Sequence, residues 1–424
     1  MNNNLKIIVK EMLLGIILFS ITTTGQGKNA QADLAKFINP LIGTDSEFKL
    51  STGNTYPAIA LPWGMNFWTP NTGKMGDGWQ YTYNANKIRG FKQTHQPSPW
   101  INDYGAFSIM PVTGDLKFKS DDRASWFSHK TETVKPYYYR VYLSDYDVWT
   151  EIAPTERAAC FRIQYPSDKA SYLVLDAFFM KSYVKIYPKE RKIIGYCRNN
   201  NGGVPDNFHN YFVLQFDTDF EDVSTWEGDS LYTGSVEKEG EHVGAAIKFK
   251  GLGKKTVNIK VSSSFISYDQ AELNLKREIG SDNFDQIQAK AHSRWNKELN
   301  RTKVEGATDA QLTTFYSALY RVLLFPRGLY EYNDKNEVVH YSPYNGKVLP
   351  GYMFTDNGFW DTFRALFPYL ALMYPDVNSH IMQGLVNTYK EGGWLPEWAS
   401  PGYRDCMIGS NSASLIADSY LKGI

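Results

Sequence analysis

The sequence predicts a two-domain protein, in which an antiparallel β-sandwich is followed by helices of an α/α toroid. Three observations predict this fold. At 424 residues, the chain is long enough for two domains. Short β-branched or aromatic runs separated by polar turns continue up to Phe265. At Ser267 the apolar period changes to that of helices. We therefore expect the sandwich at residues 31–265, a helical linker at 266–307, and the first part of the toroid at 308–424.

Residues 1–30 have the pattern of an export signal. Lys6 and Lys10 give a positive start, and the apolar run from Met12 to Thr23 is too short to span a bilayer. Ala30 supplies a small residue at the expected cleavage boundary. We expect a periplasmic or secreted protein without a stable membrane anchor. The alternative is an uncleaved N-terminal anchor.

Composition narrows the function classes. The net charge is +0 at pH 7 and the pI is about 7.0, so no electrostatic footprint for nucleic acid or anionic membrane is visible. Aromatic residues make up 15 % of the chain, a level typical of β-rich cores and of sites that bind amphipathic ligands. The three cysteines show no metal-ligand spacing, and the sequence does not decide whether Cys160 pairs with Cys197.

The predicted sandwich begins with a loop-rich stretch. Residues 37–104 are rich in Gly, Pro, Asn and aromatics, and such loops on a scaffold often carry function. Candidates for lining a pocket there are Asn54, Trp79, His95, Trp100 and Asp103, although for each of them singly a structural role is the favoured explanation. The predicted strands are 137–143, 148–154, 157–165, 171–177, 191–198, 210–216, 244–249 and 257–265. No glycine-rich phosphate loop interrupts them.

Helical patterns follow. One is expected over residues 269–300 with a break near Gly280, and the next over 308–324, ending before Pro326. Two more precede Gly393, and the first of them carries the apolar stripe Phe363, Leu366, Phe367, Leu370 and Met373. A last helix begins near Ser412 and is expected to run on at Ile424.

A loop of about twenty residues separates the last two helices, and loops of this length in compact domains are usually functional. It contains Glu397 with Trp394 and Trp398 close by. A carboxyl group walled by indoles loses water, which favours the protonated form that a general acid needs. Indoles also offer flat apolar faces to sugar rings. The alternative is an ordinary solvated acid beside two structural tryptophans.

Asp361 and Arg364 are three residues apart near the start of a predicted helix, so their side chains are neighbours. One interpretation is an ion pair that holds the first turn. The other is a carboxylate and a guanidinium that grip vicinal sugar hydroxyls.

Several long motifs carry a family resemblance. GFWDTFR, GGWLPEWASPG and CMIGSNSASLIADSYLKGI follow FINPLIGT, GNTYPAIALPWGM, GFKQTHQPSPWINDYG and IMP in order. Together they resemble the α-mannosidases of glycoside hydrolase family 92, from Phe37 to Ile424. The form THQPSPW resembles the branch that cleaves α-1,2 linkages.

The resemblance implies a β-sandwich docked on an (α/α)6 barrel, with the site at their interface. It implies exo-acting hydrolysis of α-1,2-linked mannose in N-glycans or mannan, with inversion of configuration and a required Ca²⁺ whose ligands remain unknown. Glu397 matches the acid position. The residues expected to bind substrate are Trp360, Asp361, Arg364, Trp394, Trp398, Asn54, Trp79, His95, Trp100 and Asp103.

The family's catalytic base is in an Asp-rich motif that this chain lacks. Only about four barrel helices are expected, too few to close the ring. We therefore expect an N-terminal fragment of a longer enzyme that is inactive by itself, with apolar helix faces exposed after Thr308. The alternative functions are a mannan-binding protein without catalysis and a sugar phosphorylase. An acid between tryptophans argues against the first, and the missing phosphate cradle argues against the second.

Overall fold

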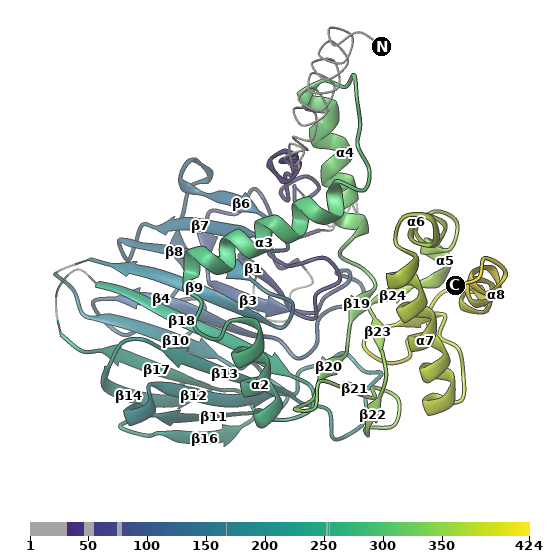
Figure 1. The fold of residues 1–424 in the computed structure, drawn as a ribbon. Coiled ribbons are helices and arrows are strands. Elements are labelled where there is room, and N and C mark those ends of the chain that lie inside the picture. Colours follow the sequence, from purple (N-terminus) through teal and green to yellow (C-terminus); the bar gives the residue numbers. More distant parts are fainter. Residues whose placement is uncertain (1–31, 46–54, 74–78, 167, 252, 254) are drawn as a thin grey trace, which may run out of the picture.

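A β-sandwich and a group of helices lie side by side in the computed structural model (Figure 1). The structure describes residues 32–45, 55–73, 79–166, 168–251, 253 and 255–424. The predicted export signal at residues 1–30 lies outside the described residues. No described helix is both long enough and apolar enough to cross a membrane.

The sandwich consists of two antiparallel sheets. One has the strand order β1-β3-β4-β10-β17-β14-β15, and the other has the order β16-β11-β12-β13-β18-β9-β8-β7-β6. The first contains β1 (Phe67–Asn71), β3 (Gly90–Thr94), β4 (Phe107–Thr113), β10 (Ser171–Asp176), β14 (Phe220–Glu227), β15 (Ser230–Thr233) and β17 (Val243–Phe249). The second contains β6 (Thr133–Lys135), β7 (Tyr138–Leu143), β8 (Val148–Pro154), β9 (Ala158–Tyr165), β11 (Ser182–Tyr187), β12 (Lys192–Cys197), β13 (Asn210–Phe216), β16 (Glu237–Gly240) and β18 (Lys255–Ser264).

Shorter elements connect these layers and the helices. They are β2 (Lys87–Ile88), β5 (Ser125–Trp126), β19 (Arg327–Gly328), β20 (Glu331–Tyr332), β21 (Val338–Tyr341), β22 (Val348–Pro350), β23 (Phe354–Thr355), β24 (Asn357–Gly358) and β25 (Trp398–Ala399). Short 3₁₀ turns occur at η1 (Ala35–Phe37), η3 (His129–Thr131) and η4 (Pro188–Glu190).

The two sheets bury a common aromatic core. Trp68 of β1 meets Phe107 of β4 and Phe161 of β9 edge to face, with ring centroids 5.7 and 4.9 Å apart. Phe107 also lies 4.5 Å from Phe212 of β13. All four rings are buried. Burying a Phe side chain contributes about 1.5–3 kcal/mol, so this inter-sheet contact is a main source of sandwich stability.

Two helices lie across the nine-stranded sheet (Figure 1). They are α2 (Tyr268–Glu278) and α3 (Phe284–Leu299), and the predicted break is present at Gly280, whose φ is 52°. The Ser267 hydroxyl caps α2, and a capping box between Asn283 and Gln286 begins α3. The predicted linker is therefore helical, and it packs on the sandwich instead of spanning open space.

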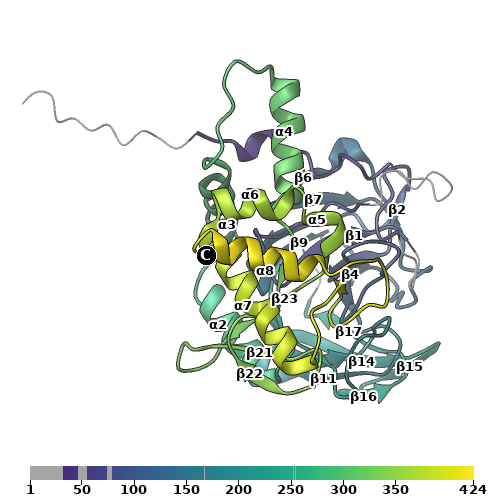
Figure 2. The same ribbon diagram turned by 90° about the vertical axis from the view of Figure 1, so that its right-hand side faces the viewer.

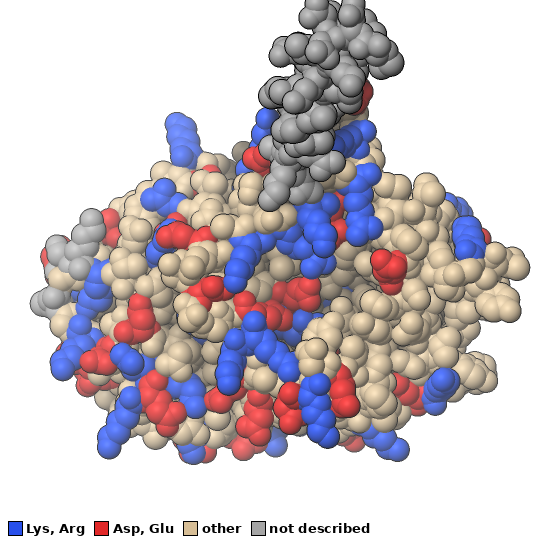
Figure 3. All heavy atoms as spheres, viewed as in Figure 1, with Lys and Arg blue, Asp and Glu red and all other residues tan. Residues whose placement is uncertain are grey.

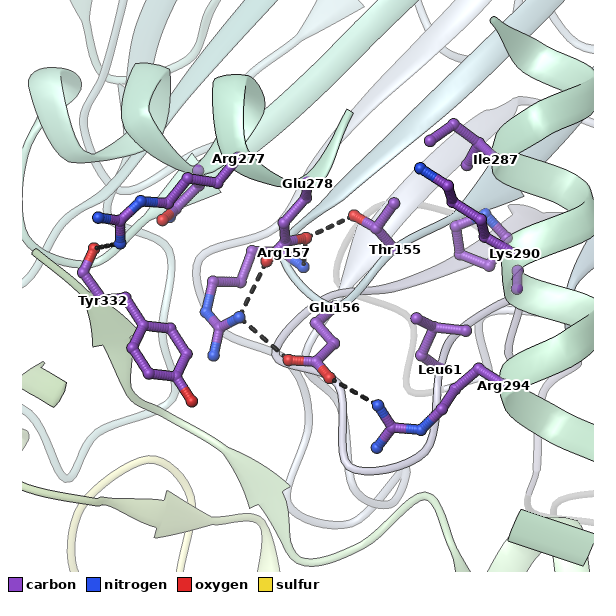
Figure 4. Close-up of a pocket in the computed structure, with 13 residues that line it drawn as sticks. Leu61, Thr155, Glu156, Arg157, Arg277, Glu278, Ile287, Lys290, Arg294 and Tyr332 are labelled. Carbon is purple, nitrogen blue, oxygen red and sulfur yellow. Dashed lines mark hydrogen bonds and ion pairs between the residues drawn. The ribbon is translucent and has the colours of Figure 1, made fainter. Parts of the chain in front are cut away.

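Ion pairs fix these two helices against the turn between β8 and β9 (Figure 4). The buried Arg157 guanidinium contacts Glu156 at 3.1 Å and Glu278 of α2 at 2.9 Å. Glu156 in turn pairs with Arg294 of α3 at 3.3 Å. A cavity of about 380 Å³ lies beside this cluster, and the four side chains named here line it. Each of these charged groups has an ionic partner, so the cluster accounts for helix docking without a ligand.

The first described residues pack with the helices and also contact the edge of the sandwich, where Lys135 of β6 donates to the carbonyls of Lys36 and Ile38. Ala35, Ile38 and Trp63 share a second apolar core with α3 and α4. The Tyr320 hydroxyl of α4 donates to the carbonyl of Ala58 at 2.7 Å. The segment before β1 therefore connects the sandwich to the helical core.

The helices after the linker are α4 (Asp309–Val322), α5 (Phe359–Thr362), α6 (Leu366–Met373), α7 (Pro375–Gly392) and α8 (Asn411–Leu421). The predicted end of α7 is confirmed, since Gly393 is left-handed with φ 84°. Two predictions were wrong. The stripe from Phe363 to Met373 is not one helix, because Ala365 (φ −132°) interrupts it, and α8 ends at Leu421.

Helices α5 to α8 gather at one side of the sandwich, where α6 packs on α7 and α7 on α8 (Figure 2). Charged side chains of both signs are dispersed over the sandwich face, whereas the surface over these helices is largely uncharged (Figure 3). Exposed large apolar side chains in this part include Leu372, Tyr389, Trp394, Ile408, Tyr420 and Leu421. The predicted exposed apolar faces are therefore present.

Candidate functional site

The loop between α7 and α8, which we call the acid loop (residues 393–410), is attached to the start of α5. The backbone N–H of Phe359 donates to the Glu397 carbonyl at 3.1 Å, and β25 pairs with β24 directly afterwards. A side chain at Gly358 would overlap the Trp398 indole, so glycine is needed there for the close approach. The backbone of Glu397 is therefore well fixed.

The Glu397 side chain lines an open cavity of about 750 Å³. Trp394, Tyr403, Arg404 and Asp405 line the same cavity. The predicted environment was wrong in one respect: Glu397 is exposed and Trp394 is 75 % exposed, so the carboxylate is not walled by two indoles. The reason is that the loop pairs along β25 and places only Trp398 against α5.

Asp361 and Arg364 do not form the ion pair that one interpretation predicts, although the structure describes both residues. The Arg364 guanidinium donates to the Trp360 carbonyl at 2.7 Å and lies 4.4 Å from the Trp360 ring centroid. The Asp361 carboxylate is exposed and is directed toward the Trp398 indole, because an added Cβ at Gly358 would meet both groups. Asp361 is thus left available at the edge of the acid loop.

Negative charge gathers around Cys406 of the acid loop. Burial raises the pKa of the Cys406 thiol, and the carboxylates of Asp405, Asp361 and Glu397 add to the increase, while Arg404 opposes it. These three carboxylates therefore lie within electrostatic range of one thiol. The segments that carry Asp361 and Glu397 are adjacent, since the Phe359 N–H donates to the Glu397 carbonyl, and Asp405, which the sequence analysis did not single out, lies in the same loop as Glu397.

Arg404 was also missed, and it connects the acid loop to the sandwich. Its Nε donates to the Ser400 carbonyl at 2.6 Å, and its Nη1 donates to the carbonyl of Asn201 between β12 and β13. Its Nη2 is buried and has no hydrogen-bond partner among the described residues.

A buried polar centre, formed by Asp356, Arg327, Tyr104 and Ser400, supports the acid loop from behind. Asp356 Oδ2 contacts Arg327 Nε at 2.5 Å and accepts from the Tyr104 hydroxyl at 3.1 Å, and its Oδ1 accepts from Ser400 at 2.8 Å. Burial raises the pKa of Asp356 to about 6, while Arg327, Ser400 and Tyr104 oppose that increase. One carboxylate thus joins the sandwich, β19 and the acid loop.

His95 is not a pocket residue, which corrects the sequence prediction. Its side chain is fully buried, with Nδ1 2.7 Å from the Tyr104 carbonyl and Nε2 3.1 Å from Asn66 Oδ1. Its ring also stacks on Tyr104 with centroids 5.0 Å apart. Burial lowers the pKa of His95 to about 3, so the ring stays neutral and structural.

Of the other predicted pocket residues in the sandwich, Trp79 and Trp100 contact each other, and Asp103 is held in an ion pair. The Trp79 and Trp100 rings meet edge to face at 5.7 Å, and Trp100 is 55 % exposed. The Asp103 carboxylate pairs with Lys92 at 2.8 Å and accepts the His95 backbone N–H, although it also borders a small cavity. Asn54 lies outside the described residues.

The described residues contain neither a Cys160–Cys197 disulfide nor a cluster of metal-ligating side chains. Cys160 and Cys197 are buried free thiols, so they do not form a disulfide. Within the described ranges, no three His, Cys, Asp or Glu side chains gather closely enough to hold a metal ion. The described donor set thus does not fit the expected Ca²⁺, and no chemical step is assigned to it.

Known proteins with solved structures share this arrangement. The family GH92 inverting mannosidase of Bacteroides thetaiotaomicron VPI-5482 is 48 % identical with a TM-score of 0.90, covering 92 % of this chain and 53 % of its own. A family GH92 α-mannosidase of Bacteroides thetaiotaomicron in complex with mannoimidazole is 26 % identical with a TM-score of 0.83, over 92 % of this chain and 53 % of its own.

A curated relative, an uncharacterized secreted glycosidase of Arthroderma benhamiae, is 23 % identical over 456 residues, which cover 97 % of this chain and 52 % of the relative. The chain thus spans about half the length of the relatives that it matches.

Family profiles cover both parts of the chain. The glycosyl hydrolase family 92 N-terminal domain matches residues 37–264, and the glycosyl hydrolase family 92 catalytic domain matches residues 270–424. The two matches meet where the sandwich ends and α2 begins. The chain therefore belongs to glycosyl hydrolase family 92.

Proposed function

We propose that this chain is part of an exo-acting, inverting α-mannosidase that removes α-1,2-linked mannose from N-glycans or mannan. The observation that carries the proposal is the acid loop, in which a fixed backbone presents Glu397 to an open cavity together with Arg404 and Asp405. The 48 % identical relative is an inverting mannosidase, and α-1,2 selectivity rests on the form of residues 94–100.

In an inverting mechanism, one carboxylic acid protonates the leaving oxygen, while a second carboxylate activates water on the opposite face of the sugar. Glu397 has the acid role in the proposal. Its exposure in this chain allows a glycosidic oxygen to reach it. The rings of Trp360, Trp394 and Trp398 offer apolar faces to the sugar. The Asp361 carboxylate accepts hydrogen bonds from sugar hydroxyls. Neither Asp356 nor Asp361 is assigned as the base, because the first is buried in an ion pair and the second has the binding role.

The proposal extends to an (α/α)6 toroid, an export signal at residues 1–30 and a Ca²⁺ requirement. A secreted relative supports export.

The complete enzyme should release mannose from α-1,2-mannobiose faster than from its α-1,3 and α-1,6 isomers. A site shaped for one linkage places the leaving oxygen at the acid only for that isomer, and misplacement by about 1 Å costs about 10²-fold. Chromatography of free mannose over time measures the three rates. Binding without release would indicate the glycan-binding alternative, and equal rates would contradict the linkage assignment.

Asp361→Ala should weaken mannose binding by the complete enzyme. The exposed carboxylate has no ion-pair partner among the described residues, so its removal should change the free energy of unfolding by no more than about 0.5 kcal/mol. Titration calorimetry measures the binding. Asp309→Ala is the matched control, since Asp309 is also an exposed acid in the first turn of a helix. Unchanged affinity in Asp361→Ala would eliminate the sugar role.

A further inference from the structure

A second cavity, which we call the amide cavity, lies in the sandwich next to the acid loop. It measures about 210 Å³ and is lined by Lys92, residues 102–103, 178–180 and 199–201. These residues come from β3 and from the connections between β3 and β4, between β10 and β11, and between β12 and β13. The proposed mechanism does not use this cavity.

The cavity combines apolar surface with fixed polar groups of no net charge. Lys92 Nζ pairs with Asp103 at 2.8 Å and lies 5.1 Å from the Phe178 ring centroid. An ammonium has three donors, so the pair with Asp103 leaves capacity for a ligand hydroxyl. Phe179 and Met180 are 39 % and 43 % exposed and give the cavity an apolar edge. Such a mixture suits a neutral amphipathic ligand like a sugar ring better than an anion.

The backbone around the cavity is held in an unfavourable conformation. Phe178, Met180 and Lys181 have φ of 61°, 68° and 71°, and Asn102 has 66°. The left-handed region is costly for residues with long side chains, and such residues cluster at ligand sites. The connection that carries these residues leaves Phe179 and Met180 exposed at the cavity edge.

The position of the cavity relative to Glu397 defines its place in the substrate path. Asn201 lines the amide cavity, and its carbonyl accepts from Arg404, which lines the cavity of Glu397. Asn102, which also lines the amide cavity, follows closely after Trp100, which is 55 % exposed. A glycan whose terminal sugar is at Glu397 can therefore extend past Arg404 toward Asn201 and the amide cavity.

We propose that the amide cavity is a distal subsite, which binds a further sugar ring on the leaving-group side of the glycan. The assignment rests on the proposed mannosidase function. It makes the enzyme selective for chains of three or more mannose units. Phe179 is the specificity-determining residue, because an exposed ring at the cavity edge can stack on the sugar.

The test compares kcat/KM of the complete enzyme for α-1,2-mannotriose and α-1,2-mannobiose. The parental ratio should exceed one by about threefold to tenfold, the effect of one aromatic contact. Phe179→Ala should reduce the ratio to near one, and Phe179→Trp should restore it. Leu231→Ala, equally exposed at 39 % on β15 and outside the cavity, should keep the parental ratio.

Two outcomes would overturn the assignment. A parental ratio of one, or a ratio that Phe179→Ala leaves unchanged, would eliminate the subsite while the mannosidase function stands. If the parental enzyme cleaves neither sugar, the proposed function fails, and the subsite fails with it.

Discussion

Replacing Glu397 with glutamine should reduce the turnover of α-1,2-mannobiose by the complete enzyme by about 10²–10⁴-fold, the usual contribution of general acid catalysis. The amide has nearly the shape of the acid but cannot protonate the leaving oxygen. Because the Glu397 carbonyl is held by Phe359 and the side chain is exposed, the substitution should leave the loop and the fold intact. Release of mannose from the disaccharide measures the effect.

A substrate with a strongly acidic leaving group provides the internal control. A dinitrophenyl α-mannoside needs no protonation to depart, so Glu397→Gln should retain far more activity on it than on mannobiose. Glu305→Gln, an exposed glutamate between α3 and α4, should behave like the parent on both substrates. Parental turnover of mannobiose by Glu397→Gln would show that another group is the acid.

Asp356→Ala should destabilise the complete enzyme by about 3–5 kcal/mol, the usual cost of removing one partner of a buried ion pair. The substitution leaves the Arg327 charge uncompensated where neither side chain is exposed. It also removes the acceptor for Ser400, so the acid loop loses a support that no backbone bond replaces. The shift of the urea unfolding midpoint measures the loss.

Two further variants separate charge from packing at this centre. Ser400→Ala keeps the ion pair and removes one hydrogen bond, so it should cost only about 0.5–1.5 kcal/mol. The double substitution Arg327→Met with Asp356→Leu removes both charges and should cost less than Asp356→Ala. A cost below about 1 kcal/mol for Asp356→Ala would mean that the pair contributes no more than an exposed one.

Local composition predicted several strands, because runs of β-branched and aromatic residues occur in them. The bounds of β8 and β13 coincide with the predicted segments 148–154 and 210–216. In contrast, β1, β3 and β4 were interpreted as part of a loop-rich region or left unassigned. Both β3 and β4 are buried along their whole length, which removes the alternation, and proline or glycine occurs in each of these three strands.

Some features of the candidate site could also be predicted from neighbouring residues in the sequence, whereas others depend on contacts between distant residues. The motif around Glu397 and the loop that carries it could be recognised because the helix before the loop ends at Gly393. The exposure of Trp394 and the burial of His95 depend on contacts with distant segments. Tyr104 and Asp356 are 252 residues apart, so no spacing rule could have joined them.

The anomeric form of the first mannose released is the most direct test of an inverting α-mannosidase. Proton NMR of the complete enzyme acting on α-1,2-mannobiose distinguishes the two forms before they interconvert in water. Direct attack of water opposite the leaving group predicts that β-mannose appears first and that α-mannose grows in later. The appearance of α-mannose first would require a covalent intermediate and a second displacement, and it would contradict the inverting mechanism proposed for this chain.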